Sequence, residues 1–452
     1  MSLPEPLANA VIPEPVLKVC ARLTERGYRA FLVGGCVRDI LRGLPPKDWD
    51  VATSAMPKDV QLSFDKVIPT GIQHGTVTVV TKGAQVEVTT FRTEGEYVDG
   101  RRPSSVEFRT EIADDLSRRD FTINAMAFDP VKKELVDPFG GQADLHKKLI
   151  RAVGTAHDRF SEDGLRALRA VRFAAVLGFS IDEETKRAIP RTIPVFKKIS
   201  VERIREEFQK LLLSDRAYLG LELLDQTGLL SVFLPELHEL RGFTHGLPMD
   251  HFELAARSVE QLSANLDQRL AALLAEIARP RTLVATPEGA SFPDHDRLGA
   301  ELTREILTRL KFPNKVIDKV VLLVREHAAA VGGSWNDGQV RRFVARVGVA
   351  NLEDLFAVME AQRRALGDET RLSQLRAFRD RVNALLREKP ALDAKSLALN
   401  GGDLMRALNV GPSPIVGEAT RFLMDLVFDN PAQNTREKLT EALRKWAENR
   451  GL

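Results

Sequence analysis

The stretch from residue 31 to residue 53, FLVGGCVRDILRGLPPKDWDVAT, constrains this chain more than any other. It is predicted to form a short apolar strand, a turn at Gly34 and Gly35, a short helix and a second strand that carries Asp48 and Asp50. Because residues two apart on a strand point to the same face, the two carboxylates are expected to project side by side. Such a pair of acids suits Mg²⁺, which proteins commonly share with substrate phosphates.

The double glycine predicts a phosphate site beside these acids. Gly34 and Gly35 permit close approach of the backbone to a triphosphate at the start of a helix, where free N–H groups face anions. Arg38, in the first turn of that helix, adds a charged donor. Alone, a Gly-Gly pair is usually a turn, and an Asp-x-Asp is more often a solvated loop than a metal site. Joined in this order, they are a specific signal, and two metal ions held there can stabilise the attacking and leaving oxygens of an in-line phosphoryl displacement.

The joined motif resembles the signature of class II nucleotidyltransferases, the tRNA CCA-adding enzymes and bacterial poly(A) polymerases of the polymerase-β-like superfamily. The resemblance implies an α/β nucleotidyltransferase head with a small mixed sheet, followed by an all-α neck, body and tail. It also implies an activity, the template-independent addition of C, C and A to the 3′ end of tRNA. The tRNA 3′ hydroxyl would attack the α-phosphate of CTP or ATP, with release of pyrophosphate.

The resemblance is strong over residues 31–179 and weaker beyond them. We expect four domains: a catalytic head, a helical neck that recognises the base, a helical body that resembles a degenerate HD domain, and a helical tail that binds tRNA. Their expected ranges are residues 1–155, 156–240, 241–335 and 336–452. The tail would hold tRNA by its shape and backbone.

Composition sets broad limits. With 452 residues the chain is long enough for several domains, and its net charge of +2 means that any RNA-binding surface must be local. Two cysteines, Cys20 and Cys36, make neither a disulfide framework nor a zinc site, and they fit a reducing cytoplasm. The N-terminus has no cationic region followed by an apolar run, and no apolar stretch approaches membrane-spanning length. We therefore expect a cytoplasmic protein without a membrane partner; the oligomeric state stays open.

Two β-rich runs, residues 75–81 and 85–92, are predicted to form a hairpin across Lys82-Gly83-Ala84. In the second run Val86 and Val88 share one face, so Glu87 would face the cleft that holds the aspartates. The alternative is an exposed strand glutamate. The resemblance favours a third carboxylate, because family members carry an acid in the same E-x-T-T-F-R context.

Residues 94–105, EGEYVDGRRPSS, are polar and without periodicity, which predicts a surface loop. The simplest alternative is a long hairpin connection. The stretch resembles the flexible loop of CCA-adding enzymes, which carries an acid and an arginine like Asp99 and Arg102. The resemblance implies that this loop helps the nucleotide pocket to change from CTP to ATP.

Residues 114–128, DDLSRRDFTINAMAF, are predicted to form a helix. Arginines near a helix start are unfavourable to its dipole, so an anionic partner is a reasonable expectation beside the alternative of a solvated charged face. The stretch resembles the family motif R-R-D-F-T-I-N-A-M-A. That resemblance assigns Arg119 and Asn124 to nucleotide binding.

Residues 160–179 are predicted to form one helix with Ser161 as its N-cap. Asp163, Arg166, Arg169 and Arg172 recur on it at three-residue spacing, so neighbours in this series share a surface. An exposed arginine-rich face is the alternative. The stretch resembles the family pattern E-D-x-x-R-x-x-R-x-x-R, which implies that the aspartate and the first arginine read the incoming base and that the later arginines lie near the triphosphate.

Residues 250–327 resemble the HD-type domain of longer bacterial CCA-adding enzymes. Ala275-Glu276 stands where the metal-binding His-Asp dipeptide is expected, although His251, His295 and His327 remain. The missing ligands argue for a structural relic and against a metal-dependent phosphohydrolase.

Two further alternatives concern RNA. A non-catalytic RNA-binding protein would keep the arginine-dense stretch 362–389, but it need not keep every head motif, and here all of them are present. CC-adding enzymes are expected to lack the Asp/Arg loop. An enzyme that adds only the terminal A, or a poly(A) polymerase, is therefore the closest alternative to full CCA addition.

Overall fold

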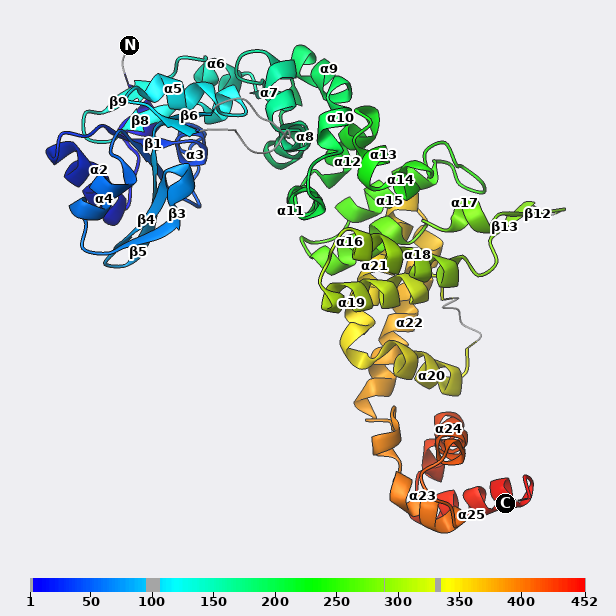
Figure 1. The fold of residues 1–452 in the computed structure, drawn as a ribbon. Helices are drawn as coiled ribbons and strands as arrows, with labels where there is room; N and C mark the ends of the chain where they lie inside the picture. The colour runs from blue at the N-terminus through cyan, green and yellow to red at the C-terminus, as the bar shows by residue number, and fades with distance from the viewer. Residues whose placement is uncertain (1–2, 95–105, 288, 330–334, 452) are drawn as a thin grey trace. The chain divides into compact units, whose positions relative to one another are not determined.

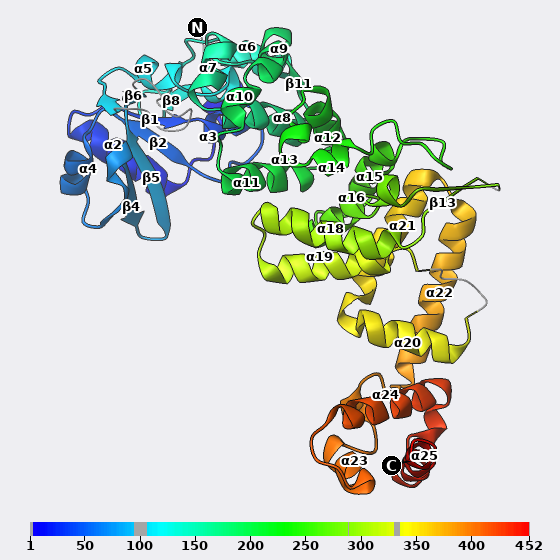
Figure 2. The same ribbon diagram turned by 45° about the vertical axis from the view of Figure 1, so that its right-hand side comes forward.

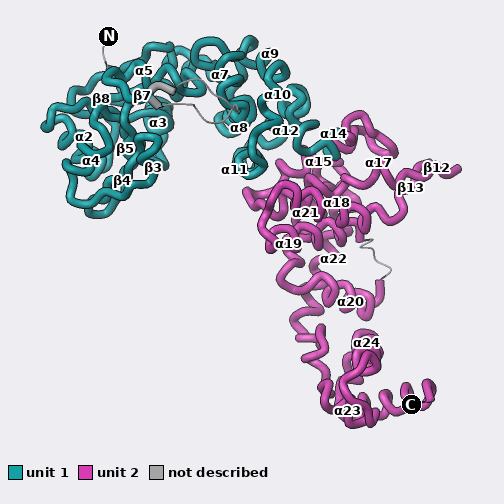
Figure 3. The backbone as a smooth tube through the Cα atoms, viewed as in Figure 1, with its two compact units in different colours: residues 1–238 teal, residues 239–452 magenta. Residues whose placement is uncertain are grey.

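The computed structural model describes residues 3–94, 106–287, 289–329 and 335–451. The chain divides into two compact units, residues 1–238 and 239–452 (Figure 3). Asp99 and Arg102 lie outside the described residues, so the predicted role of their loop stays a prediction. The four-domain division also stays a prediction.

A seven-stranded mixed sheet forms the frame of the first unit (Figure 1). At its centre β2 (Asp50–Thr53) pairs antiparallel with β1 (Ala30–Val33) and parallel with β5 (Ala84–Thr90). The spatial order is β3-β4-β5-β2-β1-β8-β9, and the other four strands are β3 (Val67–Gly71), β4 (Thr76–Thr81), β8 (Ala127–Asp129) and β9 (Glu134–Val136). A separate antiparallel pair joins β6 (Arg92–Glu94) to β7 (Val106–Phe108).

Both faces of the sheet are covered, which explains why β1 is apolar at every position. Leu32 faces a core shared with α2 (Glu14–Glu25) and α4 (Pro57–Ser63), which Figures 1 and 2 place against the same face. Phe31 and Val33 face a second core that includes α5 (Ile112–Ser117). The remaining short helices of this part are α1 (Glu5–Ala8), α3 (Gly35–Leu41) and α6 (Gly141–His146).

The predicted hairpin is confirmed. Strands β4 and β5 pair antiparallel from Thr76 to Thr81, and Thr81 pairs with Ala84 across the turn. Gly83 has a φ of +92°, a conformation that glycine adopts without strain. Val86 and Val88 are buried while Glu87 is exposed, so Glu87 occupies the face opposite the core, as expected.

The predicted helix over residues 114–128 is wrong. Helix α5 ends at Ser117, a 3₁₀ turn η2 (Thr122–Asn124) follows, and β8 begins at Ala127. The carboxylate of Asp120 accepts hydrogen bonds from the Phe121 backbone N–H and the Asn124 side chain. These local bonds offer the backbone an alternative to the helix ladder.

The predicted single helix over residues 160–179 is two helices, α7 (Ala156–Glu162) and α8 (Leu165–Leu177). Ser161 lies inside α7 and is not an N-cap. The chain breaks at Asp163, which is extended, and Gly164, where a Cβ would lie 2.7 Å from the Phe196 backbone. Close packing against that segment, which sequence periodicity does not report, ends the first helix.

The rest of the first unit is helical. Gly220 lets α12 approach α8 and α11, because a Cβ there would lie 2.7 Å from Leu211 and 3.0 Å from Ala175. A short parallel pair joins β10 (Leu149–Ile150) to β11 (Ser180–Ile181). The helices are α9 (Glu183–Arg191), α10 (Ile193–Phe196), α11 (Val201–Leu212), α12 (Ala217–Gln226), α13 (Leu230–Phe233) and α14 (Pro235–His238).

Among its described residues the second unit is helical apart from one antiparallel ribbon, which β12 (Val284–Thr286) and β13 (Gly289–Ser291) form. The expectation of an all-α body and tail did not include this ribbon. Helices α18 and α19 lie side by side in both views (Figures 1 and 2). The helices are α15 (His251–Glu260), α16 (Leu266–Leu274), α17 (Arg279–Thr282), α18 (His295–Arg309), α19 (Asn314–Glu326), α20 (Asp337–Val347), α21 (Leu352–Leu366), α22 (Glu369–Arg387), α23 (Gly401–Leu408), α24 (Pro414–Asp429) and α25 (Arg436–Glu448).

A buried acid, Glu276, lies inside this second unit. His251 Nδ1 is 3.0 Å from one carboxylate oxygen, Gln362 donates to the other at 3.2 Å, and Arg279 forms an ion pair with the same carboxylate. Burial alone would raise the pKa of Glu276, but the hydrogen bond from His251, the nearby His327 and the charge of Arg279 lower it well below its usual value. Side chains of the protein therefore balance this buried charge.

We predict that Arg279→Met destabilises the protein by about 3 kcal/mol, because it leaves a buried carboxylate without its nearest cation. Urea denaturation of the full chain measures the loss. Arg281→Met is the matched control, since its pair with Glu239 is exposed, and it should change stability by less than about 1 kcal/mol.

The pH dependence checks the cause. The folded-state pKa of Glu276 is depressed, so its contribution to stability is present above the pKa of the unfolded chain and is lost as the pH falls through the folded value. In Arg279→Met the folded pKa rises, so the difference from wild type should shrink towards low pH. A difference that does not depend on pH would contradict the assignment.

Candidate active site

Strand register places two of the predicted carboxylates side by side. Asp50 opens β2 and is the direct partner of Glu87 on β5 and of Val33 on β1. Asp48 lies in the loop before β2, so the expectation that both aspartates share one strand is wrong. This loop leaves the strand path because it contains Pro45 and Pro46, which cannot donate to a sheet ladder.

The electrostatics link Asp50 to each of the other two acids. The pKa of Asp50 is raised, mainly by desolvation and also by the charge of Asp48, although the charge of Arg119 acts in the opposite direction. Desolvation also raises the pKa of Glu87, and the charge of Asp50 raises it further, against the effect of Arg92. Within the described residues, none of the three carboxylates accepts a hydrogen bond or forms an ion pair. Like charges without partners would be relieved by a bound cation.

This arrangement suits a metal ion whose coordination is completed by the substrate better than one that protein ligands enclose. No three histidine, cysteine or acidic side chains in the described part of the chain are grouped so as to enclose a metal. Hard divalent ions such as Mg²⁺ are commonly held by one or two carboxylates together with substrate phosphates. Asp48 and Asp50 are two carboxylates of this kind.

The glycine turn lies beside these acids and is fixed by Arg119. Gly34 has a φ of +74°, and a Cβ on it would lie 2.8 Å from Arg119 Nη1. Arg119 Nη2 is 3.3 Å from Asp115, while its Nε is buried without a hydrogen-bond partner. Helix α3 begins at Gly35, so a guanidinium and the free N–H groups of a helix start lie together.

A chain of hydrogen bonds holds Arg38 at this turn. Arg38 forms a two-bond ion pair with Asp39 and donates to Asn124 Oδ1 at 2.8 Å. Asn124 donates to Asp120, whose other oxygen accepts from Arg169 at 2.6 and 2.9 Å. Burial alone would raise the pKa of Asp120, but the charge and hydrogen bonds of Arg169 help to lower it to about 2. Arg38, Asn124 and Arg169 are thus brought together as one network.

A cavity of about 290 Å³ lies next to this network. Its lining residues are Arg118, Arg119, Asp120, Asp163, Leu165, Arg166, Arg169 and Arg203. Arg172 is not among them, because it is buried against Glu207 at 2.8 Å and against the Phe173 ring at 3.5 Å. Five guanidinium groups around one small cavity favour an anionic or hydrogen-bond-accepting ligand.

The two predicted base-reading residues line this cavity with their polar groups already engaged. Asp163 forms a two-bond ion pair with Arg203 on α11, at 2.7 and 3.2 Å. Arg166 forms an ion pair with Glu162 and donates to the backbone oxygens of Arg159 and Arg118. The sequence had predicted that the two side chains lie on one helix. They do not, because α7 ends before Asp163 and Arg166 belongs to α8.

Sequence analysis missed Arg203, and it did not assign Asp120 and Glu207 to the site. Glu207 lies between Arg169 and Arg172, at 3.7 and 2.8 Å. Arg203 and Glu207 are one turn apart on an ordinary amphipathic helix, so they share a face. The polar face of α11 and the arginine-rich sequence of α8 could have indicated that charges pair between the two helices. They do not reveal which charges pair.

Comparisons with known proteins identify the class. The chain matches the family described as the poly A polymerase head domain over residues 30–151, and the probable RNA and SrmB-binding site of polymerase A over residues 178–241. It also matches a putative tRNA nucleotidyltransferase domain 2 over residues 296–443. The fold and these matches define a tRNA nucleotidyltransferase with a polymerase-β-like head, which confirms the predicted fold class.

Individual relatives narrow the class. A CCA-adding enzyme of Geobacillus thermodenitrificans is 37% identical over 427 residues, covering 94% of this chain and 95% of the relative. One from Lactiplantibacillus plantarum is 33% identical over 94% of each chain. The crystal structure of the Bacillus stearothermophilus enzyme in complex with CTP has a TM-score of 0.73 at 32% identity, covering 97% of this chain and 99% of that one. The chain belongs to the CCA-adding enzyme family.

Membership of a nucleotidyltransferase family carries a dependence on a divalent metal ion, in accordance with the unpartnered acids described above. Across the described ranges, no helix is long and apolar enough to cross a membrane.

We predict that Gly34→Ala lowers the free energy of unfolding by about 1–3 kcal/mol, because a side chain at this positive φ is strained. The new Cβ also meets Arg119 at 2.8 Å. Urea denaturation measures the change. Gly35→Ala is the matched control: the nearest atom to its Cβ is Arg38 Nη2 at an ordinary 3.6 Å, and alanine is favoured in a helix. Equal losses in both variants would contradict the prediction.

Proposed function

We propose that this chain adds C, C and A in turn to the 3′ end of tRNA, from CTP and ATP, by attack of the tRNA 3′ hydroxyl on the α-phosphate. One observation carries the proposal: the β2–β5 register sets Asp50 beside Glu87, without partners among the described residues, next to a helix start and Arg119. That combination supplies acids for a metal and donors for a triphosphate at one point. Relatives across the full chain are CCA-adding enzymes.

We assign Asp48 and Asp50 as the ligands of Mg²⁺, with Glu87 as an assisting acid. When bound, Mg²⁺ neutralises the charge that develops on the transferring phosphoryl group. Gly34, Gly35, Arg38 and Arg119 bind the triphosphate, and the Asn124–Asp120–Arg169 bonds hold Arg38 in place. Arg172 does not line the cavity and acts indirectly: it pairs with Glu207, which also pairs with Arg169. Catalysis then rests on positioning and charge stabilisation.

Base identity is read by Asp163 and Arg166, which line the same cavity. Cytosine and adenine each present an amino group beside ring acceptors, so a carboxylate and a guanidinium suit both. Uracil and guanine present a carbonyl where those bases carry the amino group, which leaves buried polar groups unpaired at about 1–3 kcal/mol each. Arg203 is a positioning residue: by holding both oxygens of Asp163 it fixes the plane in which the carboxylate accepts.

An enzyme that adds only the terminal A, or a poly(A) polymerase, is the alternative. It would use the same acids and the same triphosphate-binding residues. The two functions therefore differ in which 3′ ends of tRNA the enzyme extends. Asp99 and Arg102 are proposed to help the pocket accept ATP after CTP. The buried, free thiols of Cys20 and Cys36 support action in the reducing cytoplasm, where tRNA is found.

The function is tested with three tRNA substrates: one lacking the whole CCA end, one ending after the first C and one ending after the second. We predict that CTP alone extends the first two and that ATP alone extends the third. Growth of only the third substrate would establish an A-adding enzyme. Asp50→Asn should lower every transfer at least about 100-fold, whereas Asp65→Asn, an exposed acid of the same unit, should not.

A second prediction concerns Arg203. Arg203→Met removes the guanidinium that holds both oxygens of Asp163 and leaves the bond from the Leu165 backbone N–H, so the plane of the carboxylate is less fixed. Selection against UTP and GTP should then weaken by about 10-fold, the equivalent of one charged hydrogen bond. Single-nucleotide incorporation from all four triphosphates measures the ratio. Arg187→Met is the control, because its long pair with Glu183 is exposed. A uniform loss with all four nucleotides would show that Arg203 is only structural.

A further inference from the structure

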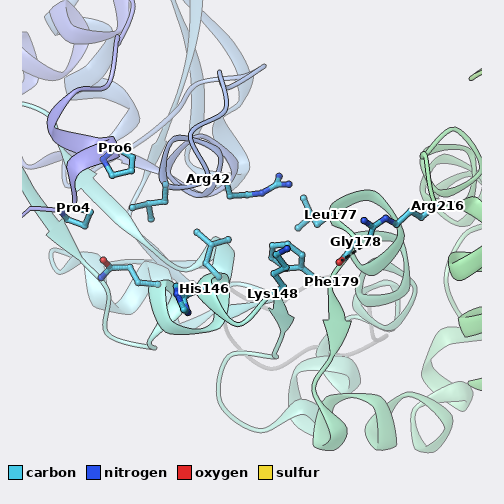
Figure 4. Close-up of a pocket in the computed structure, with 12 residues that line it drawn as sticks. Pro4, Pro6, Arg42, His146, Lys148, Leu177, Gly178, Phe179 and Arg216 are labelled. Carbon is cyan, nitrogen blue, oxygen red and sulfur yellow. Dashed lines mark hydrogen bonds between the residues drawn. The ribbon is translucent and has the colours of Figure 1, made fainter.

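A second cavity, of about 620 Å³, lies in the first unit and shares no lining residue with the catalytic cavity (Figure 4). It is formed where α1, the last turn of α3, the end of α6 and the end of α8 meet. Its volume falls within the range of small-molecule sites. The assigned reaction uses none of the residues that line it.

Basic side chains dominate the polar part of this cavity. Arg42, His146, Lys148 and Arg216 line it, and no acidic side chain is among its lining residues, all of which are described. Lys148 is exposed, and in the described part of the chain its amino group has neither a hydrogen bond nor an ion pair; the same holds for the His146 ring. The site therefore carries positive charge that the protein itself does not neutralise.

Contacts hold the two arginines toward the cavity (Figure 4). Arg216 Nη1 donates to the carbonyl oxygen of Gly178 at 3.1 Å, and any Cβ on Gly178 would collide with that guanidinium at 2.1 Å. Arg42 Nη1 is 3.5 Å from Asp39, and its guanidinium lies 5.6 Å from the centre of the Phe179 ring. Each guanidinium keeps further N–H donors for a ligand.

The remaining wall of the cavity is apolar, with Leu41, Leu177 and Phe179 among its members. A bare inorganic anion would gain nothing from such a wall. A nucleotide unit would use both parts, because its phosphate suits the cations and its base packs on apolar and aromatic surface.

We propose that this cavity is a second binding site for a nucleotide unit, with the phosphate on Lys148, Arg216 and Arg42 and the base against Phe179 and Leu177. The same chemistry is offered by one nucleotide of an RNA backbone and by a free nucleotide. Helix α3 begins at the catalytic turn and ends in this cavity, so its length places the two sites roughly 10 Å apart along the helix. A phosphate held here would anchor RNA, or sense free nucleotide, close to the reaction.

Lysine acylation of the full-length protein tests the proposal without turnover. The reaction is run in EDTA, with tRNA that lacks its CCA end, with AMP or with inorganic phosphate, and the labelling of each lysine is read by mass spectrometry. Lys147 is the internal control, because it is exposed, adjacent and not part of the cavity lining. We expect several-fold protection of Lys148 and little change at Lys147.

The pattern of protection identifies the source of the phosphate. Protection of Lys148 by tRNA alone supports an RNA backbone contact; Lys148→Gln should then lower the salt dependence of tRNA affinity by about 0.7–0.9 in log–log slope, while Lys147→Gln leaves it unchanged. Protection by AMP as well supports a free-nucleotide site. If Lys148 and Lys147 label alike with every probe, the proposal is overturned, while the proposed transferase function still stands on its own assay.

Discussion

The ion pair between Asp120 and Arg169 is the contact on which the catalytic geometry depends. Asn124 connects the pair to Arg38 at the start of α3. Arg169 also pairs with Glu207, which connects it to α11. Asp120 and Arg169 are 49 positions apart in sequence, so the pair joins the turn between α5 and β8 to the helix that lines the base cavity. A partly buried ion pair of this kind is costly to break from one side, because the remaining charge is left in a dry environment.

The carboxylates of Asp50 and Glu87, unlike that of Asp120, have no cationic partner at hydrogen-bond distance among the described residues. Asp50 and Glu87 lie side by side as direct partners in the parallel pairing of β2 and β5. Desolvation raises both pKa values, and a neighbouring acid raises each further, Asp48 for Asp50 and Asp50 for Glu87. Such an arrangement lowers stability unless a cation is bound, and clustered strain of this type is characteristic of functional sites. Nearby Arg119 relieves only part of it, since it also pairs with Asp115 and lies against Gly34.

Local sequence patterns predicted the parts of the site that depend on neighbouring residues. The alternation of Val86, Glu87 and Val88 gave the correct face, and the Gly34–Gly35 turn precedes a helix as expected. Patterns failed where distant segments decide the backbone path. Phe196 forces the break at Gly164, and the ion pair of Asp163 with Arg203 bridges 40 positions. Periodicity carries no information about such contacts, because it describes one element at a time.

Glu276 has a consequence for how the protein responds to its ionic surroundings. Arg279 balances its charge, and His251 and Gln362 form hydrogen bonds with its oxygens; all three are covalent parts of the chain. The stabilisation that a bound ion gives to a fold decreases as its free concentration falls, whereas side chains are always present at a fixed local concentration. The balance of charge around Glu276 therefore does not change when divalent ions are depleted, whereas the proposed metal-binding acids Asp48 and Asp50 would lose their cation.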